Sequence, residues 1–165
     1  MQRSTVPATL PGSLVSEGPD GTRAIGRRIG TAARPGTVLA LTGELGAGKT
    51  QLAKGVAEGL GVTSVVNSPT FVLMNEHVGR LRLYHIDAYR LADPEEAAAA
   101  GLLDEDHAGG VTVVEWADRL DGWLPVERLE IHIETPADAP MSRLLRLTAV
   151  GAPHRELAAE ALRAS

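Results

Sequence analysis

Residues 43–50 read Gly-Glu-Leu-Gly-Ala-Gly-Lys-Thr and fit the phosphate-binding pattern G-x-x-x-x-G-K-[ST] at every position. Because glycine has no Cβ, the backbone of this segment can adopt positive φ angles and turn its amide N–H groups towards a phosphate. Lys49 supplies a positive charge for the β- and γ-phosphates, and the hydroxyl of Thr50 is a ligand for Mg²⁺. The octet therefore predicts a nucleotide-binding P-loop.

The residues on either side of this octet have the patterns of a strand and a helix. Residues 37–41, Thr-Val-Leu-Ala-Leu, form a short apolar run after Pro35-Gly36, which is typical of a buried strand. Residues 49–60 carry apolar side chains at near-helical spacing, and Gly61 is a natural place for the helix to end. Strand, glycine loop and helix thus follow one another in the order that a P-loop requires.

Composition limits the class of protein. The chain has 165 residues, of which 44 % are hydrophobic and 22 % charged, as expected for one globular domain. A net charge of −5 gives no general attraction to nucleic acid or to an anionic membrane. The absence of cysteine excludes disulfides and cysteine-based zinc sites. Neither a signal peptide nor an apolar run of the ~20 residues that a membrane helix needs is found, which predicts a cytoplasmic protein.

The remaining sequence alternates between strand and helix patterns. Residues 1–12 are predicted to form a flexible tail, residues 13–150 the P-loop domain, and residues 151–165 a C-terminal helix or tail. The predicted helices span about 22–33 (capped by Asp20 or Thr22), 49–60, 93–101 and 153–163, and the predicted strands span 13–16, 37–41, 71–77, 81–86, 111–114, 129–133 and 144–150. We expect an α/β fold of the three-layer P-loop NTPase type, with a mixed, partly parallel sheet and the P-loop strand at its centre.

Glu115 is the first candidate for chemistry beyond nucleotide binding. It follows Val-Thr-Val-Val at 111–114, a pattern that brings a carboxylate to the C-terminal edge of a parallel sheet, beside the Mg²⁺ of a P-loop. The alternative is a solvent-facing glutamate at the end of a strand.

Two further polar segments are candidates for the same site. In an extended chain His85, Asp87 and Tyr89 lie on one face and Ile86 on the other, an arrangement that packs poorly unless the first face meets something polar. The segment Ser68-Pro69-Thr70 combines a stiff proline with two hydroxyl groups, although alone it indicates only a turn.

These motifs together resemble a known family. The octet is followed by Ser-Pro-Thr-Phe at 68–71, His-Ile-Asp-Ala-Tyr-Arg-Leu at 85–91 and Glu-Trp at 115–116. Their order and spacing are similar to those of the bacterial tRNA threonylcarbamoyladenosine biosynthesis ATPases, the TsaE family (formerly YjeE). The octet is widespread, whereas its combination with the other three motifs is specific, and the resemblance spans residues 13–150. Thr22 is a weaker match to an upstream threonine that contacts nucleotide in the family.

The resemblance implies a Mg²⁺-dependent ATPase that is slow alone and acts with two partner proteins, TsaD and TsaB. In this family the partners transfer threonylcarbamoyl from its adenylate to the adenosine beside the anticodon of ANN-decoding tRNAs, while ATP binding and hydrolysis support turnover of the complex. The tRNA would therefore be engaged through the complex, and no contact with a membrane is expected.

Site residues follow by matching position. The resemblance makes Lys49, Asp87 and Glu115 the catalytic residues, with Thr50 and Glu115 holding Mg²⁺ and Asp87 close to the metal or the attacking water. It places Ser68-Pro69-Thr70 in a switch-like loop near the γ-phosphate. The residues implied to bind ATP are Thr22, Glu44, Leu45, Gly46, Ala47, Gly48, Lys49 and Thr50.

Other P-loop proteins remain as alternatives. A small-molecule kinase would usually carry an arginine-rich lid, and the arginines here form no such cluster. A GTPase would need an Asn-Lys-x-Asp loop, but the one spare lysine, Lys54, lies within the predicted P-loop helix. A module that uses nucleotide as a switch without hydrolysing it is disfavoured by the presence of Asp87 and Glu115.

Overall fold

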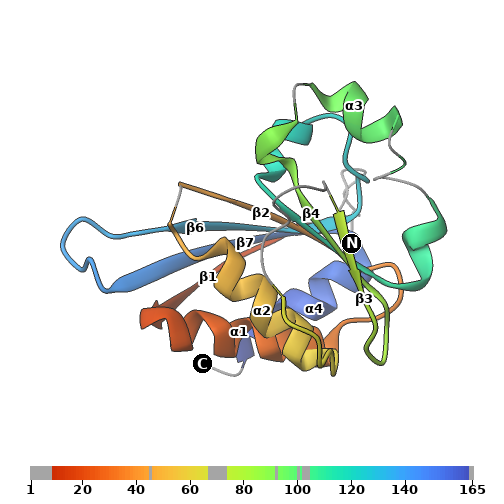
Figure 1. Ribbon diagram of the computed structural model, residues 1–165. Coiled ribbons are helices and arrows are strands. Elements are labelled where there is room, and N and C mark those ends of the chain that lie inside the picture. The colour runs from red at the N-terminus through yellow and green to blue at the C-terminus, as the bar shows by residue number, and fades with distance from the viewer. Residues whose placement is uncertain are drawn as a thin grey trace, which may run out of the picture.

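The computed structural model describes residues 9–44, 46–66, 74–91, 93–99, 101 and 105–163 (Figure 1). The helices are α1 (Gly18–Ala32), α2 (Lys49–Gly59), α3 (Pro94–Ala99) and α4 (Ala152–Arg163), with short 3₁₀ helices at Ala88–Arg90, Glu105–Gly109 and Ala117–Leu120. The strands are β1 (Thr9–Glu17), β2 (Val38–Gly43), β3 (Met74–His77), β4 (Leu83–Asp87), β5 (Val111–Glu115), β6 (Arg128–Glu134) and β7 (Ser142–Val150).

All seven strands belong to one sheet with the order β1-β7-β6-β2-β5-β4-β3. Strands β6, β2, β5 and β4 are parallel to their neighbours within this group, whereas β1, β7 and β3 are added in antiparallel pairings. The strand that leads into the P-loop, β2, is the fourth of seven. The predicted mixed sheet with a central P-loop strand is confirmed.

The sheet has a helical layer on each face, because neighbouring residues of a strand point to opposite sides. Leu39 and Leu41 of β2 enter the larger hydrophobic core, together with side chains of α1, α2 and α4. Ala40 enters a smaller core with Ala97 of α3 and Leu120 of a 3₁₀ helix. Figure 1 shows α1, α2 and α4 below the sheet and α3 above it. The three-layer prediction is confirmed.

Helices α1 and α2 pack with their backbones in direct contact. A Cβ on Gly55 would collide with the carbonyl oxygen of Arg23, and a Cβ on Gly30 would collide with that of Val56. These glycines lie within helices, where glycine costs about 1 kcal/mol relative to alanine. Here glycine is required by the close approach of the two helices.

The N-terminal region differs from the prediction. Strand β1 begins at Thr9, so residues 9–12 are not part of a tail but pair with the C-terminal half of β7, with Thr9 opposite Val150. Pro11 is tolerated because β1 is an edge strand of the sheet. The predicted edge strand at 13–16 is confirmed. The observed strand is longer than predicted because its extra residues pair with β7, which is remote in sequence.

The start of α1 also differs. The helix begins at Gly18, and its N-cap residue, Glu17, makes no side-chain cap. The predicted caps are therefore wrong, since Asp20 and Thr22 both lie inside the helix. By contrast, the predicted cap of α3 is confirmed: Asp93 Oδ1 accepts a hydrogen bond from the backbone N–H of Glu96 at 3.1 Å. Within the part of the chain that is described, no helix has the length and apolar character needed to cross a membrane.

Candidate nucleotide-binding site

The phosphate-binding loop joins β2 to α2 at the carboxyl ends of the parallel strands. Gly43, Gly46 and Gly48 have φ angles of 142°, 80° and 119°, which L side chains rarely adopt. A Cβ on Gly43 would also collide with the carbonyl oxygen of Ile133 on β6. The loop conformation thus depends on the glycines of the motif. Leu45 lies outside the described residues.

Lys49 is buried at the start of α2, with 4 % of its surface exposed. Its Nζ donates hydrogen bonds to the carbonyl oxygens of Gly43 at 2.6 Å and Glu44 at 2.8 Å. It also lies 4.0 Å from the centroid of the Trp116 ring. Burial lowers the pKa of Lys49, and the negative charges of Glu115, Asp118 and Asp87 oppose that shift. A cation held in this way has a strong electrostatic preference for an anionic ligand.

Glu115 links the loop to two strands. Its Oε1 accepts a hydrogen bond from the Thr50 hydroxyl at 2.9 Å, and its Oε2 accepts one from His85 Nε2 at 2.5 Å. The side chains of His85 and Glu115 are 0 % and 3 % exposed. Both oxygens of a buried carboxylate are thus held, so its orientation towards the N-terminus of α2 is fixed.

Asp87 lies next to Glu115 in the sheet, because the two residues are register partners in the parallel strands β4 and β5. Its Oδ1 accepts a hydrogen bond from the backbone N–H of Tyr89 at 3.0 Å and caps the following 3₁₀ helix. His85 and Asp87 share the face of β4 that the sequence predicted, whereas Ile86 enters the opposite core. Tyr89 has left the strand and contacts the Trp116 ring at a centroid distance of 4.8 Å.

Trp116 has a left-handed backbone, with φ 60° and ψ 42°. Among the described residues it is the only one other than glycine with a positive φ. This conformation ends β5 directly after Glu115 and returns the indole ring over Lys49. Such strain at a site of polar groups is a frequent property of functional sites.

Thr22 and Arg143 contact the phosphate-binding loop. Thr22 is 1 % exposed, and its hydroxyl group hydrogen-bonds Ser16 Oγ at 2.7 Å. Its methyl group lies 3.6 Å from the position that a Cβ on Gly48 would occupy. Arg143 of β7 donates from Nε to the carbonyl oxygen of Ala47 at 3.0 Å. Both contacts hold the loop from the side of α1 and β7.

The donor set fits a nucleotide with Mg²⁺. Magnesium prefers oxygen ligands and is usually bound by one or two protein side chains, with phosphate oxygens and water completing its coordination. The hydroxyl of Thr50 and the carboxylate of Glu115 are such oxygens, held next to a buried lysine. Among the described residues, no cluster of three acidic, histidine or cysteine side chains suited to a metal is found.

The structure brings most of the predicted site residues together. The predicted residues that lie in the phosphate-binding loop region or next to it are Thr22, Lys49, Thr50, Asp87 and Glu115. Leu45 and the predicted switch-like segment Ser68-Pro69-Thr70 are outside the described residues.

Sequence reasoning gave no role to three residues that the structure places here: Trp116, Arg143 and Asp118. Of these three, only Trp116 had a sequence signal that could have indicated the site, since it directly follows Glu115. Arg143 is 96 residues from its loop partner, and such a distance leaves no local pattern.

The chain resembles proteins of one family over most of its length. The family profile described as threonylcarbamoyl adenosine biosynthesis protein TsaE matches residues 16–144. A tRNA threonylcarbamoyladenosine biosynthesis protein TsaE from Bacillus subtilis is 46 % identical over 143 residues, which cover 86 % of this chain and 88 % of the relative. A TsaE from Treponema pallidum is 40 % identical over 124 residues, covering 75 % and 92 %.

A solved structure extends the likeness to three dimensions. The crystal structure of Bacillus subtilis YdiB superposes with a TM-score of 0.78 at 38 % sequence identity, covering 95 % of this chain and 97 % of that one. The phosphate-binding loop and the polar residues at the strand ends agree with this similarity in sequence and fold. The chain belongs to the TsaE family of tRNA threonylcarbamoyladenosine biosynthesis proteins.

Proposed function

We propose that this chain is a Mg²⁺-dependent ATPase whose turnover supports the transfer complex formed by TsaD and TsaB. That complex makes N6-threonylcarbamoyladenosine beside the anticodon of ANN-decoding tRNAs. We therefore propose that this chain acts in the cytoplasm. The observation that carries the proposal is the doubly held carboxylate of Glu115. It is fixed between Thr50 of the loop and His85 of β4, where a P-loop ATPase needs an acid on the metal side.

Each residue has a distinct task in the proposed reaction. The loop amides and Lys49 hold the phosphates of ATP. Thr50 and Glu115 hold Mg²⁺, which when bound neutralises charge that develops on the phosphate oxygens. Asp87, beside Glu115 on β4, acts close to the metal or on the attacking water. His85 keeps Glu115 in place by donating to its second oxygen.

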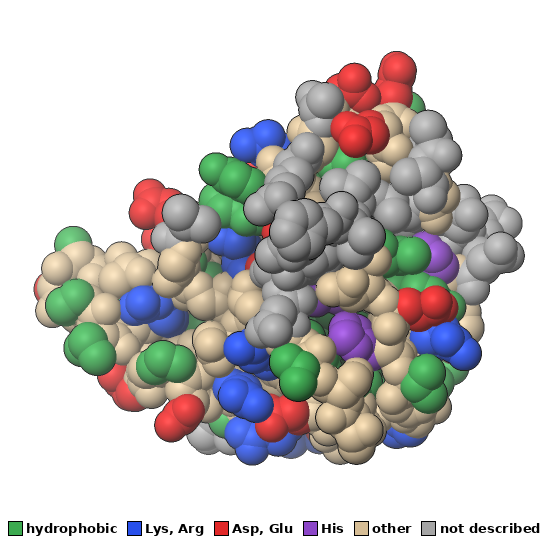
Figure 2. Space-filling model, in the orientation of Figure 1, with side chains coloured by type: hydrophobic (Ala, Val, Ile, Leu, Met, Phe, Trp, Pro, Cys, Tyr) green, Lys and Arg blue, Asp and Glu red, His purple; other side chains and the backbone are tan. Residues whose placement is uncertain are grey.

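The surface supports indirect engagement of tRNA. On the face drawn in Figure 2, acidic and basic side chains are interspersed. Some of these charges are paired in the structure, as Arg23 is with Glu58 at 2.7 Å. With a net charge of −5, this chain has little general attraction to a polyanion. We therefore assign tRNA contact to the complex.

The test separates binding from turnover at Glu115 and Asp87. Neither Glu115→Ala nor Asp87→Ala removes the loop amides or Lys49, so ATP affinity should stay within about tenfold, or about 1.4 kcal/mol, of wild type. Hydrolysis should fall by roughly a hundredfold or more, because metal placement and water positioning act mainly in the transition state. Affinity is measured by calorimetry and hydrolysis by phosphate release.

His85 provides a matched pair of variants. In His85→Gln the side-chain amide can still donate to Glu115, whereas His85→Leu removes this donor from the carboxylate of Glu115. We expect His85→Gln to retain more hydrolysis than His85→Leu, with ATP affinity similar in the two folded variants. Circular dichroism and thermal unfolding check that both are folded.

Three assays distinguish the proposal from its rivals. Phosphate release is measured with ATP alone, with candidate phosphate acceptors, and with TsaD, TsaB and tRNA. Stimulation by the partners, with tRNA modification lost in parallel in both alanine variants, supports the proposal. Acceptor-dependent phosphorylation would identify a kinase, and modification without hydrolysis would identify a nucleotide switch. Normal hydrolysis with failed modification would assign Glu115 and Asp87 to the partner interface.

A further inference from the structure

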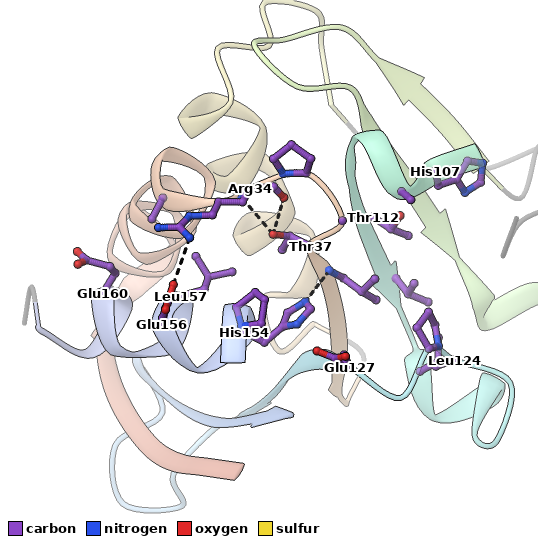
Figure 3. A pocket seen from close by; sticks show the side chains of 18 residues that line it. Arg34, Thr37, His107, Thr112, Leu124, Glu127, His154, Glu156, Leu157 and Glu160 are labelled. Atoms are coloured by element: carbon purple, nitrogen blue, oxygen red, sulfur yellow. Dashed lines mark hydrogen bonds and ion pairs between the residues drawn. The ribbon is translucent and has the colours of Figure 1, made fainter. Parts of the chain in front are cut away.

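A cavity lies at the end of strand β2 opposite the P-loop. It has a volume of about 650 Å³, in the range of small-molecule sites. It opens where β2 begins at Val38, whereas the phosphate loop follows the other end of that strand at Gly43 (Figure 3). Its walls are largely apolar, formed by Val38, Val114, Leu124, Pro125, Pro153 and Leu157.

His154 of α4 lines this cavity and carries a hydrogen-bond donor that has no partner among the described residues. The residue is 5 % exposed, and its Nε2 accepts the backbone N–H of Val38 at 3.0 Å. An Nε2 that accepts a hydrogen bond carries no proton, so the ring proton is on Nδ1. Burial lowers the pKa of His154, against the attraction of Glu127, which favours this neutral tautomer. Nδ1 is buried and has no partner among the described residues.

Glu127 supplies an acceptor at the rim. It lines the same cavity, and its negative charge is close enough to act on His154. No ion pair or hydrogen bond of its side chain is found within the described residues. The other rim carboxylates have partners: Glu156 pairs with Arg34 at 3.2 Å, and Glu160 pairs with Arg163 at 2.6 Å. In Figure 3 the labelled side chains of Glu127 and His154 lie near one another, which agrees with the effect of Glu127 on the pKa of His154.

We propose that this cavity binds a small neutral molecule that combines an apolar body with a carboxamide or lactam group. The carbonyl oxygen of that group accepts from His154 Nδ1, its N–H donates to the carboxylate of Glu127, and the apolar body fills the hydrophobic walls. A carboxylate in the same place would face Glu127 and be repelled. A hydrocarbon of the same size would gain no hydrogen bond from His154, so it should bind more weakly.

Three probes of one ring size test the proposal: benzamide, benzoate and toluene. Each is titrated into the full chain while the backbone amide signals of Val38 and His154 are followed by ¹H–¹⁵N NMR. We expect saturable shifts with benzamide, at least tenfold weaker affinity for toluene, and no saturation with benzoate. Saturating Mg²⁺-ATP should leave benzamide affinity unchanged, because the phosphate loop is at the other end of β2. Competition between the two would overturn the assignment of a separate site.

Two rim variants provide the matched comparison. Glu127→Ala removes the unpaired acceptor and should weaken benzamide binding by about tenfold or more. Glu160→Ala removes a carboxylate that is already paired with Arg163, and benzamide binding should be unchanged. Both positions are exposed, so folding should be preserved in each. Equal effects of the two variants, equal affinities for the three probes, or no shift at Val38 and His154 would each overturn the proposal.

Discussion

The hydroxyl group of Thr50 lies 2.9 Å from Glu115 Oε1, although 65 residues separate the two in the chain. Thr50 lies in the first turn of α2 and Glu115 is the last residue of β5, so the contact joins the start of this helix to the neighbouring parallel strand. Two oxygens of the type that Mg²⁺ prefers are thereby held side by side.

Thr50→Ala should weaken nucleotide binding more in the presence of Mg²⁺ than in its absence, because it removes the hydroxyl proposed to bind the metal and leaves the loop amides and Lys49 in place. Calorimetric titration of ATP with Mg²⁺ and with a chelator measures the difference. Thr50→Ser keeps the hydroxyl group and is the control, for which the Mg²⁺ dependence should be close to that of wild type. Equal losses of affinity under both conditions in Thr50→Ala would contradict a role in metal binding.

Trp116 should report nucleotide binding through its fluorescence. Lys49 lies against its ring and is bonded to two loop carbonyls, so engagement of phosphates by Lys49 changes the surroundings of the indole. The measurement uses a Trp123→Phe background, since Trp123 is a second, exposed indole. Adding Lys49→Ala should abolish stable nucleotide binding and the signal with it. A silent Trp116 under saturating Mg²⁺-ATP, or wild-type affinity in Lys49→Ala, would argue against this arrangement.

Gly55→Ala should destabilise the fold by about 2 kcal/mol. Alanine is the better helix former, but its Cβ would collide with the backbone carbonyl of Arg23 and force α1 and α2 apart. Gly109→Ala is the control, because a Cβ there meets nothing within 4 Å, and its effect should stay within about 0.5 kcal/mol. Urea unfolding of the two variants measures both values. Similar stability in the two would show that the helices can separate freely.

The stability of the protein should fall in mildly acidic solution because of His154. Burial lowers its pKa below the ordinary value of 6.5, so the unfolded chain takes up a proton that the folded chain refuses. The stabilisation is therefore fully present above pH 6.5 and is lost as the pH falls towards the folded pKa, at up to about 1.4 kcal/mol per pH unit.

Urea unfolding at a series of pH values tests this with His154→Gln, whose side-chain carbonyl can still accept from Val38. The slope below pH 6.5 should be shallower in the variant. It should not vanish, since burial and the neighbouring His85 lower the pKa of His77 as well. Identical slopes in the two proteins would exclude His154 as a contributor.

The central part of the fold is readable from sequence because its signals are local. The glycines of the loop, the apolar run before it and the helical spacing after it lie within 25 residues, and β2 and α2 form where these patterns predict them. The placement of Glu115 beside Thr50 also follows, since the ends of neighbouring parallel strands meet at one edge of a sheet.

Other features depend on partners that are distant in the chain. Residues 9–12 carry Pro11 and Gly12 and have no strand pattern, yet they are a strand because β7 pairs with them. The contact of Arg143 with the loop and the meeting of His154 with Val38 arise from the tertiary arrangement in the same way. The glycines of α1 and α2 weaken a helix prediction until the opposing backbone is known.

The left-handed backbone of Trp116 sets stability and activity against each other at one position. A bulky L-residue in this conformation costs about 1 kcal/mol or more, which glycine would avoid. A search for more stable variants would therefore favour glycine there and would discard the ring that lies over Lys49. Variants selected for heat resistance alone should therefore gain thermal stability and lose nucleotide affinity or hydrolysis.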